Sequence, residues 1–186
     1  MENNSCDDEN VQLIKKLKAG SFLVAKEDLS DPNFESTLVF ICQYSSEGAY
    51  GLVLNKVANM PLSEIFNLEE KDFSRSRKIH LGGPVSESQL QILHLTDKPA
   101  EEAIMVSKGI YLGGIWKDLN EILTSHPERL ILFLGYSGWG AGQLEEEVRL
   151  GGWKVMKGDA EEVLLAEEQL LSLGIREFEK IYLHTK

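Results

Sequence analysis

Two almost unbroken apolar runs stand out along the chain and indicate the centre of a sheet. Residues 37–44 (TLVFICQY) are rich in β-branched and aromatic side chains, and residues 130–134 (LILFL) are apolar throughout. Such runs are typical of strands that are buried on both faces. Residues 49–54 (AYGLVL) follow the first run after a turn sequence, which predicts an antiparallel hairpin, and Gly51 within them indicates a bulge or a close backbone approach.

The rest of the chain alternates short strand patterns with short helical patterns. We predict further strands over 21–25, 78–81, 89–95, 103–107, 109–112, 153–156 and 180–184. Helical spacing of apolar residues predicts helices over 11–18, 59–66, 115–123, 143–150 and 159–173. On the first helix, the predicted apolar face is Val11, Ile14 and Leu17. Residues 135–142 (GYSGWGAG) are predicted to form a glycine-rich loop between a strand and a helix.

Neither a repeat nor a linker interrupts residues 11–186, so we expect a single α+β domain there. Residues 1–10 (MENNSCDDEN) carry four acidic side chains and no basic one, which predicts a disordered acidic leader. That segment lacks the basic and apolar parts of a signal peptide. No apolar run approaches the ~18 residues of a membrane-spanning helix, so we expect a cytoplasmic protein without membrane association.

Charge restricts the partners of this chain. The sequence has 30 acidic and 19 basic residues, for a formal net charge of −11. Such an excess repels nucleic-acid phosphates and anionic lipid, and no helix-turn-helix pattern is evident. The composition therefore argues against direct nucleic-acid binding.

Cysteine and histidine are too sparse to predict a metal or redox centre. Cys6 lies in the polar leader and Cys42 in an apolar run, so a structural disulfide is not expected. The four histidines are neither four residues apart nor next to a cysteine, and a metal site would have to gather them from distant strands. We therefore expect no metal and no cofactor. The alternation in 89–95 directs His94 toward the core.

The GYSGWGAG segment carries the most distinctive chemistry. A strand that leads through glycines into a helix N-terminus offers bare N–H groups to an anion. However, the segment has no lysine, lacks the spacing of phosphate-binding loops, and precedes three glutamates at 145–147. The alternative is a tight turn in which Tyr136 and Trp139 pack. Ser137 lies in G-x-S-x-W, not in the G-x-S-x-G of a hydrolase elbow.

Six short stretches have a recognisable order and spacing. They are GSFLVA at 20–25, DPNF at 31–34, EGAYGLVLNK at 47–56, LGGPV at 81–85, LH at 93–94 and LGYSGWGAGQLEEE at 134–147. Together they resemble the YqgE/AlgH family of bacterial proteins, from about Gly20 to Val163, whereas residues 167–186 do not match. The resemblance implies an α+β fold whose mixed, largely antiparallel, bifurcated sheet forms a partial barrel flanked by helices.

The resemblance implies a regulatory association and no established biochemical activity, because one branch of the family is linked to control of alginate synthesis and to transcriptional regulation. We therefore expect a binding or regulatory protein that acts through a protein partner or a small ligand. The alternative is an enzyme that acts on a phosphorylated or acyl substrate at 135–142. In that case His94, Ser137 or Glu146 would serve as acid–base or nucleophilic groups.

The two glycine segments, 82–83 and 135–142, suggest where a ligand would bind. If they converge at one sheet edge, they form a small polar pocket with aromatic walls. The expected ligand-binding residues are Asn55, Gly82, Gly83, His94, Tyr136, Ser137, Gly138, Trp139, Gly140, Gln143 and Glu146.

Overall fold

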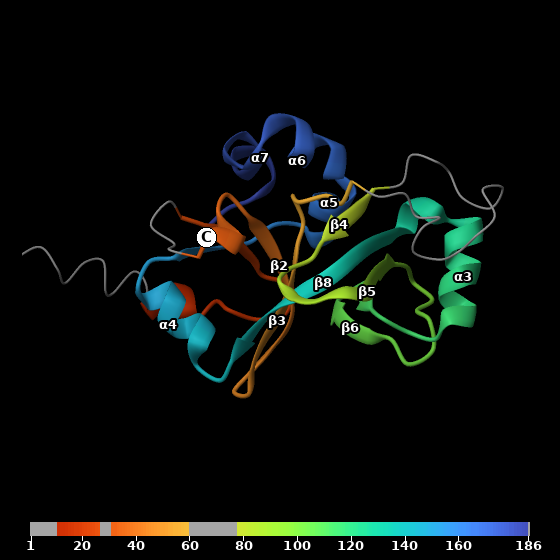
Figure 1. The fold of residues 1–186 in the computed structure, drawn as a ribbon, viewed down its shortest axis with the longest axis horizontal. Helices are drawn as coiled ribbons and strands as arrows, with labels where there is room; N and C mark the ends of the chain where they lie inside the picture. Colours follow the sequence, from red (N-terminus) through yellow and green to blue (C-terminus); the bar gives the residue numbers. More distant parts are fainter. Residues whose placement is uncertain (1–10, 27–30, 60–77, 186) are drawn as a thin grey trace, which may run out of the picture.

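A computed structural model of the chain describes residues 11–26, 31–59 and 78–185. It shows one large sheet with helices packed around it (Figure 1). The strands are β1 (Phe22–Ala25), β2 (Leu38–Ser45), β3 (Gly48–Val53), β4 (Ile79–Leu81), β5 (Val85–Leu95), β6 (Ile104–Ser107), β7 (Ile110–Leu112), β8 (Leu130–Gly140) and β9 (Trp153–Met156). The helices are η1 (Pro32–Phe34), α3 (Trp116–Ser125), η2 (Pro127–Arg129), α4 (Gln143–Arg149), α5 (Ala160–Leu165), α6 (Glu167–Leu173) and α7 (Ile175–Tyr182).

The strand order is β6-β7-β5-β8-β3-β2-β1-β9, with β4 as an additional neighbour of β8. All pairs are antiparallel except β4 with β8, which is parallel. The α+β class and the mixed, largely antiparallel sheet are thus confirmed. The sheet is not closed into a barrel, because β6 and β9 form its two ends. The predicted leader and all but the first residue of the predicted 59–66 helix lie outside the described residues.

The sheet divides along β8. One edge of β8 pairs with β5, whereas the other edge pairs first with β4, up to Leu134, and then with β3, from Ser137 onward. Between these two pairings lies Gly135, whose φ of +67° is accessible to glycine at little cost. β8 therefore belongs to both halves of the molecule.

The predicted glycine-rich loop at 135–142 is wrong for most of its length. β8 continues to Gly140, and residues Ser137 to Gly140 pair with Gly51 to Gly48 of β3. Hydrogen bonding to a neighbouring strand outweighs the low strand propensity of glycine. Only Ala141 and Gly142 remain between β8 and α4.

The C-terminal prediction also needs correction. The helix predicted over 159–173 is interrupted at Ala166, which separates α5 from α6. The strand predicted over 180–184 lies largely in α7, where Phe178 and Tyr182 stack with ring centroids 4.4 Å apart. Four-residue spacing places both rings on one helix face. Only an isolated bridge from Lys157 to His184 resembles the predicted strand.

The N-terminal helix is shorter than predicted, and its predicted apolar face is correct in part. Helical structure covers residues 11–14, and the buried side chains are Leu13 and Leu17, whereas Val11 is exposed. The i, i+4 pair Leu13 and Leu17 packs with the cluster that includes Trp153. Of the predicted face, Leu17 is buried and Ile14 packs partly buried against this cluster, so the prediction is wrong only at Val11.

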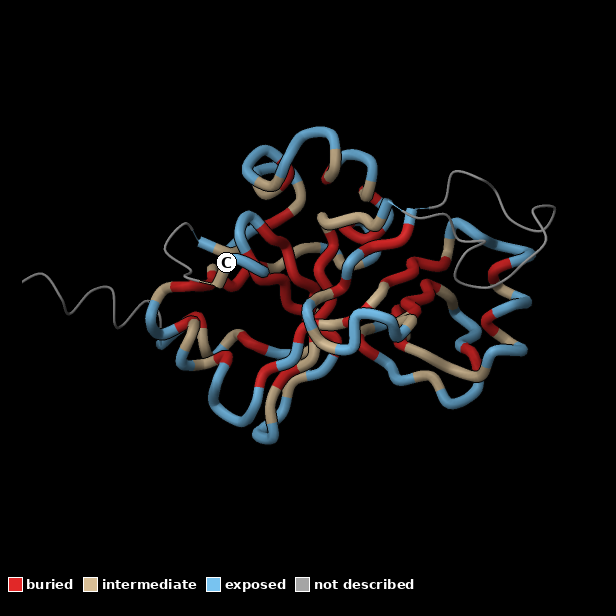
Figure 2. The backbone as a smooth tube through the Cα atoms, in the orientation of Figure 1, coloured by how far each residue is buried: buried red, intermediate tan, exposed pale blue. Residues whose placement is uncertain are grey.

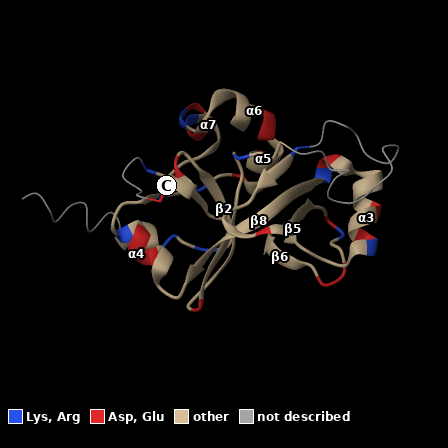
Figure 3. Ribbon diagram, in the orientation of Figure 1, with Lys and Arg blue, Asp and Glu red and all other residues tan. Residues whose placement is uncertain are grey.

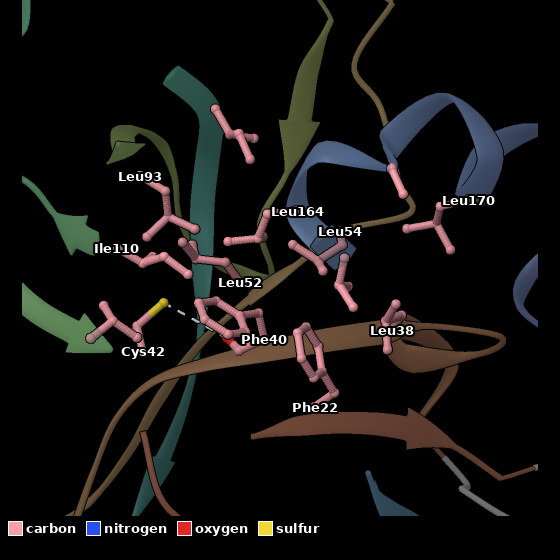
Figure 4. Packing of buried hydrophobic residues seen from close by; sticks show 14 of the residues in the cluster. Phe22, Leu38, Phe40, Cys42, Leu52, Leu54, Leu93, Ile110, Leu164 and Leu170 are labelled. Atoms are coloured by element: carbon pink, nitrogen blue, oxygen red, sulfur yellow. Dashed lines mark hydrogen bonds between the residues drawn. The ribbon is translucent and has the colours of Figure 1, made fainter. Parts of the chain in front are cut away.

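The core lies on both faces of the sheet (Figure 2). In β2, Leu38, Phe40 and Cys42 face a cluster covered by α5, α6 and α7 (Figure 4). The intervening Val39 and Ile41 face a second cluster, which contains residues of α4 and the N-terminal helix. The prediction that this strand is buried on both faces is confirmed. A third cluster packs under α3. None of the helices in the described part is both long and apolar enough to cross a bilayer.

Candidate functional site

The structure brings the two glycine segments into direct backbone contact. The Gly82 N–H donates to the Leu134 carbonyl at 2.8 Å, and the Ser137 hydroxyl donates to the Gly82 carbonyl at 3.1 Å. A Cβ on Gly83 would lie 2.4 Å from the Ser137 hydroxyl oxygen and from Tyr136 backbone atoms. The two segments pack directly against each other, so this crossing is a structural joint.

The aromatic side chain of Tyr136 also packs within the protein. Its ring stacks on Tyr50 with centroids 4.6 Å apart, and a Cβ on Gly138 would lie 3.3 Å from it. Gly138 therefore leaves room for the ring of Tyr136. Burial raises the pKa of Tyr50, and the neighbouring Cys42 and Tyr136 raise it further.

Trp139, Gln143 and a residue that the sequence analysis did not select form a polar cluster at α4. Gln143 Oε1 accepts the Gly140 N–H at 3.0 Å, and Gln143 Nε2 donates to Glu147 Oε1 at 2.9 Å. Glu147 Oε2 accepts the indole N–H of Trp139 at 2.9 Å and that of Trp153 at 2.7 Å. The four-residue spacing of Gln143 and Glu147 was the signal available in the sequence.

Glu146 and Asn55 lie apart from this cluster. Glu146 is exposed and forms a salt bridge with Arg149, which lowers the pKa of the Glu146 carboxyl group. Asn55 Oδ1 accepts the Leu38 N–H at 2.9 Å, and its Nδ2 donates to the Ser36 carbonyl at 2.7 Å. Asn55 thus joins the end of β3 to the start of β2.

His94 is fully buried on β5, next to β7. Its Nε2 accepts the Ala100 N–H at 3.2 Å, and its ring stacks on Tyr111. Burial lowers the pKa of His94, so the neutral ring is favoured. His94 pairs in register with Leu130, at the opposite end of β8 from Ser137. His94, Ser137 and Glu146 therefore do not share a site.

A groove lies beside the glycine joint. This groove has a volume of about 670 Å³, within the usual ~300–1,000 Å³ of small-ligand pockets. Its lining is Pro32, Asn33, Val53, Lys56, Val57, Ala58, Asn59, Leu81, Gly83, Pro84, Glu87 and Leu134. Of the residues selected from the sequence, only Gly83 lines it.

Main-chain hydrogen bonds hold one wall of the groove in place. The Leu81 N–H donates to the Lys56 carbonyl at 2.8 Å, and the Ala58 N–H donates to the Ile79 carbonyl at 2.7 Å. The segment that follows β3 therefore runs alongside β4. Lys56 belongs to the matched stretch at 47–56, but a lone lysine after a strand gives no sign of a cavity in the sequence.

Few of the described residues that line the groove carry titratable or nucleophilic side chains. Among the described residues of its lining, Lys56 and Glu87 are the titratable ones, and none of these described residues is a serine, cysteine or histidine. Across residues 11–26, 31–59 and 78–185, no group of three or more histidine, cysteine or carboxylate side chains is arranged to hold a metal ion. The described lining of the groove thus offers mainly apolar surface to a ligand.

Comparison with known proteins agrees with the fold described above. The profile of the family described as AlgH-like matches residues 22–174. A UPF0301 protein of Chlorobaculum tepidum is 33% identical over 165 residues, which is 86% of each chain. A UPF0301 protein of Burkholderia multivorans is 36% identical over 148 residues, which is 74% of this chain and 76% of the relative.

Two solved structures share the architecture. The solution structure of the AlgH protein from Pseudomonas aeruginosa superimposes with a TM-score of 0.67 at 27% identity, over 83% of this chain and 86% of that one. The crystal structure of protein DIP2367 from Corynebacterium diphtheriae gives a TM-score of 0.62 at 20% identity, over 75% of each chain, and shows the fold alone. The profile match and these sequence relatives show that the chain belongs to the YqgE/AlgH family.

Proposed function

We propose that this protein binds a small ligand in the groove between η1, β4 and the start of β5, and that it acts as a binding or regulatory protein. The observation that carries the proposal is the groove itself. It is large enough for a small molecule, and the described part of its lining is mainly apolar, with neither a nucleophile nor a histidine among those residues. Ligand binding would then change how the protein contacts a partner protein.

The regulatory part of the proposal follows the family association. Direct contact with nucleic acid is not part of it, because the net charge of −11 opposes binding to phosphates. We also propose a cytoplasmic location. The cytoplasm keeps thiols reduced, which is compatible with the buried free thiol of Cys42. An enzyme at residues 135–142 is not supported, because Ser137 is buried and its hydroxyl bonds to Gly82.

Thermal unfolding with a ligand panel tests the groove. The panel contains nucleotides, sugar phosphates, acyl thioesters and simple carboxylates. A ligand at 100 times its Kd stabilises the folded state by about 2.7 kcal/mol. For a chain of this length, the expected rise in Tm is roughly 5–10 °C.

Two matched variants locate the binding site. Leu81→Trp fills the groove from β4, whereas Leu150→Trp makes the same change at an exposed leucine just after α4. A ligand that raises the Tm of wild type and Leu150→Trp, and leaves Leu81→Trp unchanged, supports the proposal. An equal shift in both variants would show that the ligand binds elsewhere. A panel without any hit would favour regulation through protein contacts alone.

A further inference from the structure

Lys56 lines the groove, and its ammonium has no ion-pair partner within the described part of the chain. Its main chain is fixed beside β4, and its side chain is half-buried. The ammonium donates to the Asn33 carbonyl of η1 at 2.6 Å. An ammonium has three N–H donors, and a carbonyl carries no net charge. Among the described residues this contact therefore uses one donor and leaves the positive charge uncompensated.

The carboxylates of the described segments do not pair with Lys56. Glu87 lines the same groove but is exposed and forms no ion pair with Lys56. Elsewhere, lysines do pair with glutamates, as in Lys154 with Glu179 and Lys180 with Glu177. Acidic residues outnumber basic ones in this chain (Figure 3), and what sets Lys56 apart is that its ammonium lies in the lining of a largely apolar groove.

The rest of the described lining is largely apolar and would match a ligand with an apolar body. Val53, Val57, Leu81 and Leu134 contribute aliphatic side chains, and Pro32 and Pro84 contribute rings. A ligand that covers this surface removes apolar area from water, which favours binding. An ammonium beside this surface binds an anion more strongly than it would in open water, because the local dielectric constant is lower.

We infer that the ligand of the groove is a small carboxylate with an apolar body, whose head group binds the Lys56 ammonium. This inference rests on the proposed function and specifies its ligand class. The carboxylate would accept the N–H donors that Asn33 leaves unused. The aliphatic or aromatic body would lie along Val57, Leu81 and Leu134. The inference involves binding only and requires no chemical step.

Three matched probes test the inference in the full-length protein: 4-phenylbutyrate, 4-phenylbutanol and 4-phenylbutylamine. They share one apolar body and differ in the charge of the head group. Titration calorimetry gives each Kd, and amide chemical shifts give the location. We expect a Kd for the carboxylate at least tenfold lower than for the alcohol, and the weakest binding for the amine. The perturbed amides should include Val57, Leu81 and Leu134.

Substitutions at Lys56 separate the effect of its positive charge on ligand binding from the effect of its side-chain length. Lys56→Met keeps the length of the side chain and should bring the carboxylate and alcohol to within about twofold, and Lys56→Arg should retain the preference. Lys117→Met, at an exposed position on α3, is the control and should change nothing. Amide spectra of each variant check that it is folded.

The outcomes distinguish this inference from the proposed function. Equal Kd values for carboxylate and alcohol in wild type would overturn the role of Lys56 and leave the groove as an apolar binding site. A preference that survives in Lys56→Met would overturn it as well. If none of the three probes binds, both the carboxylate inference and the apolar groove as a binding site are overturned.

Discussion

Trp139 and Trp153 donate their indole N–H groups to the same carboxylate oxygen, Oε2 of Glu147. Trp139 lies on β8 and Trp153 on β9, the last strand of the sheet, so Glu147 on α4 joins two strands that are not neighbours. The two rings also meet edge to face, with centroids 6.0 Å apart. The three glutamates at 145–147 are thus not one solvated surface, because Glu147 is a structural link and Glu145 accepts the Tyr44 hydroxyl.

Removal of this carboxylate should destabilise the fold. Glu147→Leu leaves two buried indole N–H groups without their acceptor, and each buried donor left unsatisfied costs about 1–3 kcal/mol. We expect the free energy of unfolding to fall by roughly 2–4 kcal/mol. Urea unfolding followed by tryptophan fluorescence measures it. Glu146→Gln, at the adjacent exposed position, should leave the urea midpoint nearly unchanged, and equal losses in the two variants would contradict the assignment.

The joint between β4 and β8 should not tolerate a side chain at Gly83. A Cβ there would lie 2.4 Å from Ser137 and Tyr136 atoms, at a φ of +151°. Because most of these atoms are backbone, relief requires movement of a strand, and we expect Gly83→Ala to cost about 3 kcal/mol or more.

Gly140→Ala is the control for this joint. Its Cβ would contact only the Gln143 side chain, at 3.9 Å. We expect a change within about 0.5 kcal/mol in urea unfolding. Similar losses at Gly83 and Gly140 would show that the glycines act through chain flexibility and that the close contact at Gly83 carries no special cost.

His94 should make stability depend on pH. Burial lowers its pKa in the folded state, so the unfolded state binds the proton more tightly. Stability is therefore lost as the pH falls through the unfolded value of ~6.5. His94→Gln keeps an acceptor for the Ala100 N–H and removes this titration. Urea unfolding between pH 7.5 and 5.5 should show a steeper loss in wild type than in His94→Gln, and parallel curves would refute the prediction.

Cys42 should be chemically inert in the folded protein. Its thiol is 1% exposed, and burial raises the pKa of that thiol. Because the thiolate is the reactive form, alkylation should be very slow in buffer and fast in urea. A Cys6→Ser variant isolates the signal, and mass spectrometry with iodoacetamide measures it. Rapid labelling under native conditions would contradict the burial of Cys42.

Local composition was enough to predict the strands that are buried on both sides. In β2 the apolar run is unbroken, so its strand character and its hairpin with β3 follow from residues close together in sequence. The strand from Ser137 to Gly140 depends on pairing with residues 48–51, which no local pattern shows. α7 was missed because its last residues form a short apolar run that resembles a strand.

The candidate site was less predictable than the fold. The sequence selected the glycines correctly as unusual positions, but their role is close contact between β4 and β8, as Gly83 shows. The groove is formed by η1, the segment after β3 and the end of β4, which come together only in the folded protein. Lys56 is a candidate ligand-binding residue because it has no carboxylate partner in the described structure. This cannot be seen in the sequence, because ion pairs depend on the fold.

The position of β8 also determines when the protein can fold. Residues 130–140 supply the partner for β5, β4 and part of β3, all of which are synthesised earlier. A growing chain therefore carries open edges on β5, β4 and β3, which are sites of aggregation, until β8 leaves the ribosome, and the edge of β1 stays open until β9 follows. Pairing between residues as distant as Gly48 and Gly140 gives slow, non-local folding. Chains that stop before β8 should need chaperone protection, and the two halves of the sheet should form in a single late event.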